Sequence, residues 1–311
     1  MQWSEERTKR LWQRQNIVRH IRDYFFSEGF LEAETPLHVK GTCPDAYIDS
    51  MEVAGGYLVT STEYQIKRMI IGGFDKVFTL TKNFRAHDVG RFHSQEFTML
   101  EWARTGKTLD AIEDDVQHIL TQLAPNLKPC IRLTVRDAFK RHLGLENLED
   151  FSLDPLIKAC RRADVELPAG FTEDKYLLMS YLFGELQKHL GYDTPTFLRD
   201  WPFYLTTSAP RTAHDPYAAE RSELYMNGCE IADGFPFLTD AALQKKLFQE
   251  ELELRKHYNK PTVTLDEKFL QELATGMPEG AGMALGVDRL VMILTGASSL
   301  AEVQAFTWDE L

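Results

Sequence analysis

Hydrophobic and polar residues alternate along this chain with two periods, one typical of helices and one typical of strands. Residues 15–28 form an amphipathic pattern inside a helical stretch expected over residues 2–28, and apolar residues recur at helical spacing over 109–123. A charged segment over 241–258 also predicts a helix. Runs of β-branched and aromatic residues predict strands at residues 47–53, 57–60, 77–81, 97–101, 196–205 and 223–231.

The stretch over residues 125–195 differs in character from the sequence on either side. It consists of polar helical segments with interruptions, such as LENLEDFSLDPLIKACRRADVELP, and strand-like sequence precedes and follows it. We therefore expect a single domain over residues 1–311 that carries a helical insertion at about residues 125–195.

Composition sets broad limits on the class of protein. A hydrophobic content of 43% is enough to bury a sizeable core. No apolar run of membrane-spanning length is present, and the start MQWSEERTKRLWQRQ lacks an apolar signal segment, so we expect a cytoplasmic protein without a membrane partner. Cys43, Cys130, Cys160 and Cys229 are scattered, which predicts reduced thiols and no structural zinc.

The formal net charge of −12 bears on nucleic-acid binding. A polyanion is usually met by a basic protein surface that releases counterions, and an acidic protein lacks such a surface. Many acidic enzymes carry their charge only for solubility. The charge therefore counts modestly against RNA and identifies no partner.

The first segment that carries chemistry is FRAHDVGRFHSQEFTMLEW, from Phe84 to Trp102. Strand-like flanks surround a polar loop that holds Arg85, Asp88 and further cationic side chains. This pattern predicts a hairpin with cations at its mouth.

The second segment is GMALGVDRLVM, from Gly282 to Met292. Small residues precede Arg289, and an apolar helix-like run follows, so a nucleotide could approach the backbone closely there. Either segment alone is weak evidence for a nucleotide site, because a Phe-Arg pair is common on protein surfaces and a glycine-interrupted apolar run is commonly part of a core. Together they predict an ATP site.

These segments resemble motifs 2 and 3 of the class II aminoacyl-tRNA synthetases, in the order of that family. The helical pattern over 15–28, followed by GFLEAETP, resembles motif 1 with its terminal proline at Pro36. The phrases TSTEYQIKRMIIGGFDKVFTLTKNFR, ELYMNGCEIADGF and ALGVDRLVMILTGASSLAEVQAF are similar to the lysyl-tRNA synthetase branch. Within that branch the chain most resembles the short elongation factor P β-lysine ligases, over roughly residues 16–308.

The resemblance implies an α+β fold in which an antiparallel sheet is flanked by helices, and a homodimer formed through motif 1. Motif 1 begins so near the N-terminus that no room remains for an oligonucleotide-binding barrel, so we expect no anticodon-binding domain and no binding of a tRNA anticodon. The implied partners are an amino acid substrate and a protein acceptor such as elongation factor P.

The implied chemistry is formation of an aminoacyl-adenylate from ATP with Mg²⁺. Such a step depends on cations that neutralise phosphates and hold the reacting groups in line. By resemblance, Arg85 would hold the α-phosphate and the reacting carboxylate, and Arg289 would contact the γ-phosphate and flank the adenine. Phe97 would stack on the other face of the adenine, and the backbone at Gly286 would lie close to the nucleotide.

The resemblance also implies that Glu223 and Glu230 bind Mg²⁺ through carboxylate oxygens, with Ile231 beside the nucleotide. Residues seven apart on one strand face opposite sides of a sheet. Asn227-Gly228 is a strong hairpin signal, so we expect the two glutamates on adjacent strands, where they can converge. The alternative is that they are solvated strand carboxylates.

The amino acid itself would lie at Ser61, Thr62 and Glu63, in the phrase TSTE. Glu63 would receive the α-amino group of the substrate. The alternative role for Glu63 is capping of the helix that follows.

Motif 2 departs from the family in two positions. Where the lysine-handling members have Arg-Asn-Glu, this chain has Arg85, Ala86 and His87, and Ser94 stands in place of an asparagine. An imidazole has thus replaced a carboxylate, and Asp88 could substitute only if the loop bends. We expect adenine contacts that are weakened or rebuilt.

The side-chain pocket for the amino acid departs further. The family holds the lysine ammonium with a glutamate and a tyrosine, and these positions are Phe237 and Ala103 here. Loss of the partners of a buried charge costs roughly 3 to 5 kcal/mol, so we expect an uncharged amino acid in place of lysine. The alternative is that Asp233 or Asp240 replaces the missing carboxylate.

Three function classes follow. The leading interpretation is an ATP-dependent aminoacyl ligase that transfers to a protein lysine, as the elongation factor P ligases do. The alternatives are an amino acid activating enzyme with a small-molecule or carrier-protein acceptor, and a non-catalytic regulatory paralogue. The set of Arg85, Arg289, Glu223 and Glu230 argues against the third class, and His87 mildly favours it.

Overall fold

The computed structural model describes residues 4–146, 148 and 150–311. The chain divides into two compact units, which we call the main unit (residues 1–126 and 236–311) and the inserted unit (residues 127–235). The predicted first helix is present as α1 (Glu5–Ser27), and the start of that prediction, at positions 2 and 3, lies outside the described residues.

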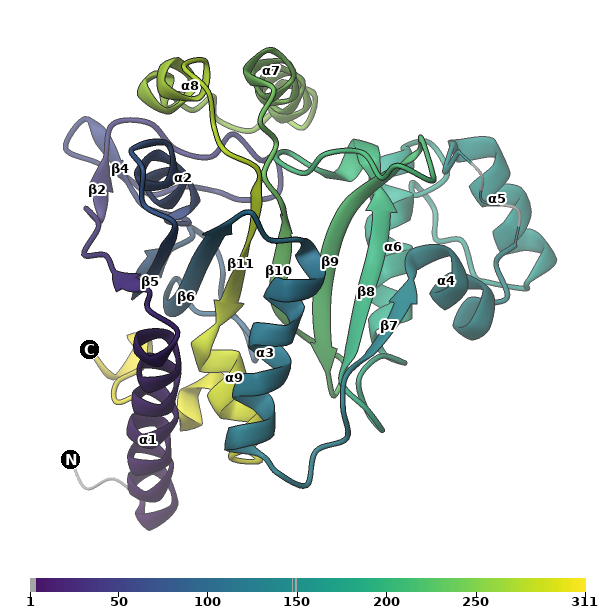
Figure 1. Cartoon of the computed structure of the whole chain (residues 1–311). Helices are drawn as coiled ribbons and strands as arrows, with labels where there is room; N and C mark the ends of the chain where they lie inside the picture. The colour runs from purple at the N-terminus through teal and green to yellow at the C-terminus, as the bar shows by residue number, and fades with distance from the viewer. Residues whose placement is uncertain (1–3, 147, 149) are drawn as a thin grey trace. The chain divides into compact units, whose positions relative to one another are not determined.

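The main unit contains a sheet with strand order β1-β5-β6-β11 (Figure 1). β1 runs parallel to β5, and the other neighbours are antiparallel. A smaller sheet has the order β2-β4-β3. The strands are β1 (Leu31–Glu32), β2 (His38–Val39), β3 (Glu52–Val53), β4 (Gly56–Leu58), β5 (Lys76–Phe84), β6 (Glu96–Thr105) and β11 (Gly280–Gly286). The remaining helices are α2 (Glu63–Ile71), α3 (Leu109–Leu123), α7 (Ala241–His257), α8 (Glu267–Leu273), α9 (Val287–Leu294) and the short turns η2 (Leu300–Glu302) and η3 (Trp308–Glu310).

Helices cover both faces of the main sheet because successive strand residues point to opposite sides. Val77 and Ala103 pair across β5 and β6 and join a hydrophobic cluster with α2, α7 and α8. The next pair, Phe78 and Trp102, points the other way, toward α1, where Phe25 stacks on Phe78 with ring centroids 4.8 Å apart. The α2 side of β6 is the side that carries the candidate site.

A buried carboxylate joins α1, α3 and β6 on the opposite face. Asp115 of α3 accepts hydrogen bonds from Tyr24 Oη at 2.6 Å, Trp102 Nε1 at 3.0 Å and Arg104 Nη2 at 2.6 Å. Burial raises the pKa of Asp115, and these three donors act in the opposite direction. The donors therefore compensate the burial of the charge and fix the two helices against the sheet.

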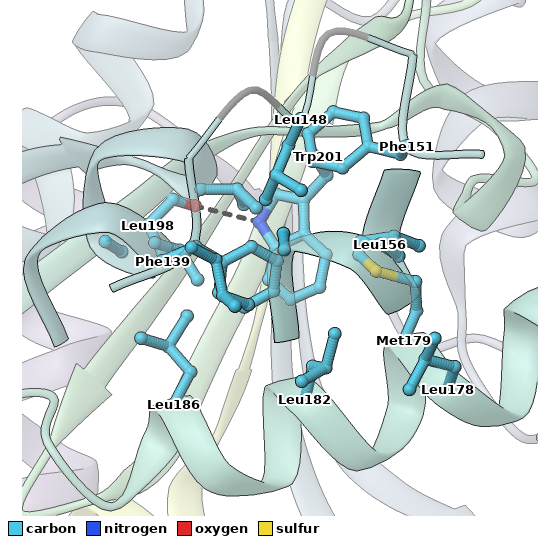
Figure 2. Packing of buried hydrophobic residues seen from close by; sticks show 14 of the residues in the cluster. Phe139, Leu148, Phe151, Leu156, Leu178, Met179, Leu182, Leu186, Leu198 and Trp201 are labelled. Carbon is cyan, nitrogen blue, oxygen red and sulfur yellow. Dashed lines mark hydrogen bonds between the residues drawn. The ribbon is translucent and has the colours of Figure 1, made fainter. Parts of the chain in front are cut away.

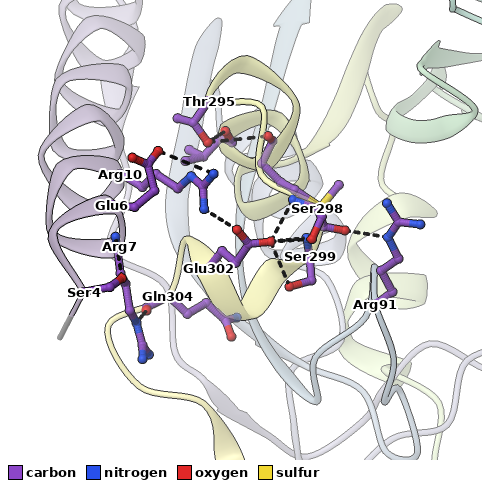
Figure 3. Close-up of polar contacts among 12 residues, drawn as sticks. Ser4, Glu6, Arg7, Arg10, Arg91, Thr295, Ser298, Ser299, Glu302 and Gln304 are labelled. Atoms are coloured by element: carbon purple, nitrogen blue, oxygen red, sulfur yellow. Dashed lines mark hydrogen bonds and ion pairs between the residues drawn. The ribbon is translucent and has the colours of Figure 1, made fainter. Parts of the chain in front are cut away.

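A second polar network connects α1 to the C-terminal segment (Figure 3). Arg10 of α1 pairs with Glu302, whose carboxylate also accepts hydrogen bonds from the Ser298 backbone at 2.8 Å and its hydroxyl at 2.6 Å. Arg91 donates from Nε to the Ser298 carbonyl at 2.5 Å. The β5–β6 loop and α1 are thus both fastened to the turn after α9.

The inserted unit has a strand order of β10-β9-β8-β7, with β7 parallel to β8 and the other neighbours antiparallel. Its helices bury one large hydrophobic cluster, in which Trp201 Nε1 donates to the Leu198 carbonyl at 2.9 Å (Figure 2). Phe183 packs against this cluster and stacks on Trp201 with ring centroids 4.2 Å apart. The elements are β7 (Ile131–Thr134), α4 (Val135–Leu143), α5 (Leu153–Arg162), α6 (Lys175–Gln187), β8 (Thr196–Pro202), η1 (Phe203–Leu205), β9 (Ala218–Met226) and β10 (Cys229–Pro236). The stretch expected to be a helical insertion therefore carries α4, α5, α6 and one strand.

The α+β prediction and the helix over 109–123 are confirmed. The antiparallel expectation fails at β1 and β7, which pair in parallel. The predicted strand over 47–53 is wrong except for β3, because Arg255 Nη1 binds the carbonyls of Asp45 and Ile48 at 2.8 and 2.9 Å and holds this stretch as a loop. The predicted strand over 196–205 ends at Pro202 in a 3-10 turn.

Two global expectations concern membranes and thiols. None of the helices within residues 4–146, 148 and 150–311 is both long enough and apolar enough to span a bilayer. All four cysteines are free thiols.

Candidate active site

The β5–β6 hairpin presents a polar loop at its mouth. Its strands pair in register from Lys76 opposite Arg104 to Phe84 opposite Glu96, which confirms the predicted hairpin. The loop is closed at its base by a hydrogen bond from the Arg85 backbone to the Gln95 carbonyl at 2.9 Å.

The two departures from the family lie within this loop. His87 is exposed and takes a left-handed backbone conformation with φ of 67°, which is uncommon for a residue with a β-carbon. Ser94 is half-buried near the end of the loop. The loop therefore bends sharply at the position where the family has its glutamate.

Arg85 lies over Phe97, with its guanidinium carbon 5.2 Å from the ring centroid. Arg85 Nε is buried, and among the described residues it has no hydrogen-bond acceptor. A buried donor without a partner costs about 1 to 3 kcal/mol. A ligand that brings anionic oxygens to the guanidinium and a flat ring to Phe97 would remove that cost, and a nucleotide has both features.

A floor of small residues lies beside Phe97 and Glu101. Cross-strand partners share a face, and β11 places Gly282 opposite Ala103, Ala284 opposite Glu101 and Gly286 opposite Met99. A β-carbon added at Gly282 would lie 2.8 Å from the carbonyl oxygen of Trp102, so this position accepts only glycine without a backbone shift. On the face of the sheet that carries Arg85 and Phe97, β11 therefore presents only glycine and alanine.

Arg289 lies in the first turn of α9, beside the hairpin loop. Its Nε donates to the Phe92 carbonyl at 3.1 Å, and Nη2 lies 3.0 Å from Nε2 of His93, which acts as the acceptor. The structure thus brings Arg289 to the same loop as Arg85, with part of the guanidinium held by the backbone.

Asp288, the residue before Arg289, provides a hydrogen-bond acceptor for β6 just beyond the end of β11. Gly286 is the last β11 residue in register with β6, so the next β6 amide has no strand partner on that side. Asp288 Oδ2 accepts the hydrogen bond of the Thr98 amide at 2.7 Å, and Asp288 is only 2% exposed. Arg14 of α1 pairs with the same carboxylate and donates to Thr98 Oγ1 at 3.0 Å. This network fixes the neighbours of Phe97 and Arg289.

Glu101 gathers the residues of the TSTE phrase. Ser61 Oγ donates to Glu101 at 2.5 Å, the Thr62 amide donates at 2.5 Å, and the Thr62 hydroxyl donates as well. Burial raises the pKa of Glu101, while these hydrogen bonds lower it and the charge of Glu63 raises it. The carboxylate of Glu101 therefore anchors Ser61 and Thr62 at the start of α2.

Glu63 starts α2 and pairs with Lys67, one turn later, at 2.5 Å. The Lys67 side chain is only 3% exposed, so this pair is screened little by solvent. Glu63 lies in the first turn of α2, where Ser61 Oγ accepts the hydrogen bond of the Glu63 amide at 3.1 Å. A pocket open to solvent adjoins Ser61 and Glu63 and is lined by Val39, Gly41, Thr42, Cys43, Val59, Thr60, Ser61, Glu63, Tyr64 and Gln65.

Phe237 and Ala103 lie close together in the core of the main unit. Both belong to the hydrophobic cluster under α2, α7 and α8, and a β-carbon at Gly282 would lie 3.5 Å from Ala103 Cβ and 3.6 Å from the Phe237 ring. Asp240, one alternative source of a carboxylate, caps α7 through hydrogen bonds to the amides of Ala242 and Leu243 at 2.9 and 3.0 Å.

The acidic candidates lie in the inserted unit, where Glu223 is on β9 and Glu230 on β10. Asn227 and Gly228 join the strands with φ of 51° and 71°, which confirms the predicted hairpin. Glu230 pairs with Tyr225, and a register shift at Ile231 then places Asp233 opposite Glu223. Because Tyr225 is two residues from Glu223 on β9, its cross-strand partner Glu230 faces the same side as Glu223, and the bulge then brings Asp233 to that side as well.

Arg221 holds this acidic cluster together. It donates to Glu223 at 2.7 Å and to Asp233 at 2.9 Å, so Asp233, the other alternative carboxylate, already has a cationic partner. Tyr225 Oη donates to Glu223 at 2.6 Å. Burial raises the pKa of Glu223 well above its ordinary value, Arg221 opposes this shift, and Glu230 adds to it.

The acidic cluster fits a magnesium ion that arrives with phosphates. Mg²⁺ commonly takes one or two carboxylates together with substrate phosphates and waters, and Glu223 and Glu230 supply two. Over the described residues, no group of three or more histidine, cysteine, aspartate or glutamate side chains is placed to hold a metal by itself. The donor set suits a metal–nucleotide complex better than a metal alone.

Sequence reasoning missed Glu101, Asp288 and Arg221. Glu101 is the charged residue in the apolar run FTMLEW, and that exception was the available signal. Asp288 and Arg221 lie beside predicted site residues, but their roles depend on Thr98 and Asp233, which are distant in sequence.

Comparisons with known proteins agree over nearly the full length. The sequence model of the family described as tRNA synthetases class II (D, K and N) matches residues 2–310. Elongation factor P--(R)-beta-lysine ligase of Salmonella paratyphi B is 37% identical over 310 residues, which cover 96% of this chain and 95% of the relative. Ligases of the same name from Salmonella heidelberg and Salmonella enteritidis align with the same identity and coverage.

Proposed function

We propose, on the premise that the chain belongs to the class II tRNA synthetase family (D, K and N), that it joins an amino acid to AMP and passes the aminoacyl group to a protein acceptor. Membership gives the chain the class II fold and an ATP-dependent ligase activity, and no anticodon-binding domain is evident in the matched span. The observation that carries the proposal is Arg85, which lies over the Phe97 ring and whose buried Nε has no acceptor among the residues that the structure describes.

The first step is attack of the substrate carboxylate on the α-phosphorus of ATP, with pyrophosphate as the leaving group. Arg85 would bind the α-phosphate and the attacking carboxylate, and Arg289 would bind the outer phosphates at the start of α9. The adenine would lie between Phe97 and the Arg289 side, over the floor at Gly286. These residues supply positioning and positive charge, which is most of what phosphoryl chemistry asks of a protein.

We propose Mg²⁺ as the companion of ATP, held by Glu223 and Glu230, with Ile231 beside the nucleotide. The metal would neutralise phosphate charge when bound. The support is the β9–β10 hairpin, which brings the two carboxylates to one side of the inserted unit's sheet. His87 and Ser94 would complete the adenine contacts from the hairpin loop.

The amino acid would bind at Ser61, Thr62 and Glu63, with its α-amino group at the carboxylates of Glu63 and Glu101. Glu63 is already paired with Lys67, and Glu101, which anchors Ser61 and Thr62, is a second acidic side chain at this place. Loss of both ammonium partners of the family, at Phe237 and Ala103, supports an uncharged side chain rather than lysine.

The specificity claim is tested by restoring the lost partners. A protein with Phe237→Glu and Ala103→Tyr should gain lysine-dependent release of pyrophosphate. If the double variant folds and gains no lysine activity, the substitutions at these two positions do not explain the specificity.

In the second step, the ε-amine of an acceptor lysine would attack the acyl carbon, and AMP would leave. The relatives are named for elongation factor P, which makes this factor the first acceptor to test. Incubation of the factor with the chain, ATP and the activated amino acid should raise its intact mass by one aminoacyl residue. An unchanged mass alongside proven adenylate formation would exclude this acceptor.

We further propose a cytoplasmic homodimer that forms through α1. The support is that α1 exposes two large apolar side chains, Trp12 and Phe26, which a partner chain would cover. A translation factor as acceptor would place the enzyme in the cytoplasm. Sedimentation should give twice the chain mass of 35.8 kDa, and a monomer at micromolar concentration would contradict the dimer.

A further inference from the structure

We propose that the amino acid activated by this chain is small as well as uncharged, because the ring of Phe237 fills the far end of the side-chain pocket. The inference rests on the proposed function and deepens it by naming the class of substrate. Loss of charge recognition alone would leave room for a long apolar amino acid, so size is a separate question from charge.

The site residues follow one another along a single face of β6. Phe97, Glu101 and Ala103 are separated by even numbers of residues, so their side chains project from the same side of the strand. Phe97 marks the nucleotide end, under Arg85. Glu101 marks the α-amino end, where Ser61 and Thr62 donate to it. Ala103 therefore marks the direction in which the substrate side chain extends.

The space available to the substrate side chain in that direction is short. Two residues of strand rise about 6.6 Å, so the Ala103 position lies roughly that far beyond Glu101. The ring of Phe237 lies over this position, against the pair formed by Ala103 and Gly282. A long side chain would run into the ring before it could extend fully.

The ring of Phe237 spans two glycines of β11, with one edge near Gly282 and the other near Gly280. A β-carbon at Gly280 would lie 2.6 Å from the ring of Phe237, so the ring already rests on the bare backbone of β11. The Phe237 amide donates to the Gly280 carbonyl at 2.8 Å, which fixes the main chain on the same strand. Phe237 is 6% exposed.

The ring is also held by the core behind it. Phe237 shares its hydrophobic cluster with Tyr64, Phe248 and Phe269, and Tyr64 stacks on Phe269 at 4.8 Å. In a closely packed protein interior, a phenyl group can move aside only if its neighbours also shift, and this costs free energy. Phe237 is therefore a fixed wall at the Ala103 position.

The test measures binding of non-reactive adenylate analogues, which does not depend on turnover or on an acceptor. Glycyl-, alanyl-, seryl-, leucyl- and lysyl-sulfamoyl adenosine are titrated calorimetrically into the full chain with Mg²⁺. We expect the first three to bind at least about 100-fold more tightly than the leucyl and lysyl analogues, since a pocket too short by several methylene groups discriminates at that level.

A matched pair of variants separates the wall from general stability. Phe237→Ala should improve binding of the leucyl analogue by about 100-fold relative to the alanyl analogue. Phe248→Leu alters another ring of the same cluster and should leave the order of preference unchanged.

The outcomes are distinguishable. Equal binding of leucyl and alanyl analogues to the unaltered chain would overturn the size limit and leave the proposed function standing. A retained preference for small analogues in folded Phe237→Ala would show that another residue sets the limit and would also overturn the inference. Failure of every analogue to bind would remove the proposed function and the inference with it.

Discussion

Arg85 illustrates how a single residue can point to a ligand. Its guanidinium stacks on Phe97, yet its buried Nε has no acceptor among the described residues. Natural proteins leave few buried polar groups unsatisfied, and those that remain call for an explanation. A phosphate oxygen at Nε provides that explanation, and it agrees with the position of Arg289 on the same loop.

Substitution of either arginine should separate chemistry from folding. Arg85→Ala and Arg289→Ala should each lower the rate of adenylate formation by about 10² to 10³, the usual cost of removing one donor to a developing charge. Arg85→Lys should also be impaired, because an ammonium group cannot stack and donate in the plane of a guanidinium. The rates are measured by pyrophosphate release, with urea unfolding as the folding control. A folded Arg85→Ala protein with unaltered rates would refute the site.

At the scale of elements, α1 supports the site without contacting the proposed ligands. Arg14 pairs with buried Asp288, and Asp288 completes the edge of β6 at Thr98, next to Phe97. Removal of one partner of a buried pair leaves an uncompensated charge. The helix assigned to motif 1 is therefore coupled to the segments assigned to motifs 2 and 3.

Two arginines of α1 provide a matched comparison for this coupling. Arg14→Ala should lower the free energy of unfolding by about 3 to 5 kcal/mol, because it leaves the buried charge of Asp288 without its cationic partner. Arg22→Ala breaks an accessible pair with Glu32 at 2.9 Å and should cost no more than about 1 kcal/mol. Urea denaturation of both variants checks the difference. Equal losses would contradict the role given to Asp288.

Glu251 on helix α7 should make the stability of the folded chain depend on pH. Burial and the neighbouring charge of Asp45 raise the pKa of Glu251 from 4.5 to about 7, although its carboxylate accepts the Ala46 amide at 2.8 Å and Arg255 lies nearby. The folded chain therefore binds this proton more tightly than the unfolded chain does. The free energy of unfolding should fall as pH rises from about 4.5 to about 7, by roughly 3 kcal/mol in total from this group.

Glu251→Gln should remove that part of the pH dependence. The variant should match the parent near pH 4.5 and exceed its stability above pH 7, where the parent carries a buried charge. Glu253→Gln, an exposed change on the same helix, should leave the profile unaltered. Urea unfolding across this range is the measurement, and an unchanged slope in Glu251→Gln would assign the pH dependence to other groups.

At the scale of the whole molecule, local patterns predicted most of the elements. The helix over 109–123 and both hairpins follow from periodicity and from the Asn227-Gly228 turn, which act over short stretches of chain. The same reasoning predicted a strand over 47–53 that is mostly absent. Arg255, on a helix some two hundred positions away, binds the carbonyls of Asp45 and Ile48 and holds this stretch as a loop. Parallel pairing of β1 with β5 was missed for the same reason: nothing local encodes it.

The candidate site shows the same division. Arg85, Phe97 and Arg289 were predictable from motifs, and the structure brings Arg289 to the loop that starts at Arg85. The anchoring of Ser61 and Thr62 by Glu101 was not predictable, since it joins a strand to a distant loop. The fixed wall at Phe237 also depended on Gly280, whose lack of a side chain has meaning only in three dimensions.

The central claim is that this chain activates an amino acid with ATP. The most direct measurement is amino acid-dependent exchange of pyrophosphate into ATP, made with purified protein, Mg²⁺ and each standard amino acid in turn, together with β-lysine and ornithine. The account predicts exchange with one or a few small uncharged amino acids and none without Mg²⁺. Exchange driven by lysine or β-lysine would contradict the assigned specificity, and no exchange with any amino acid in the panel would contradict the central claim.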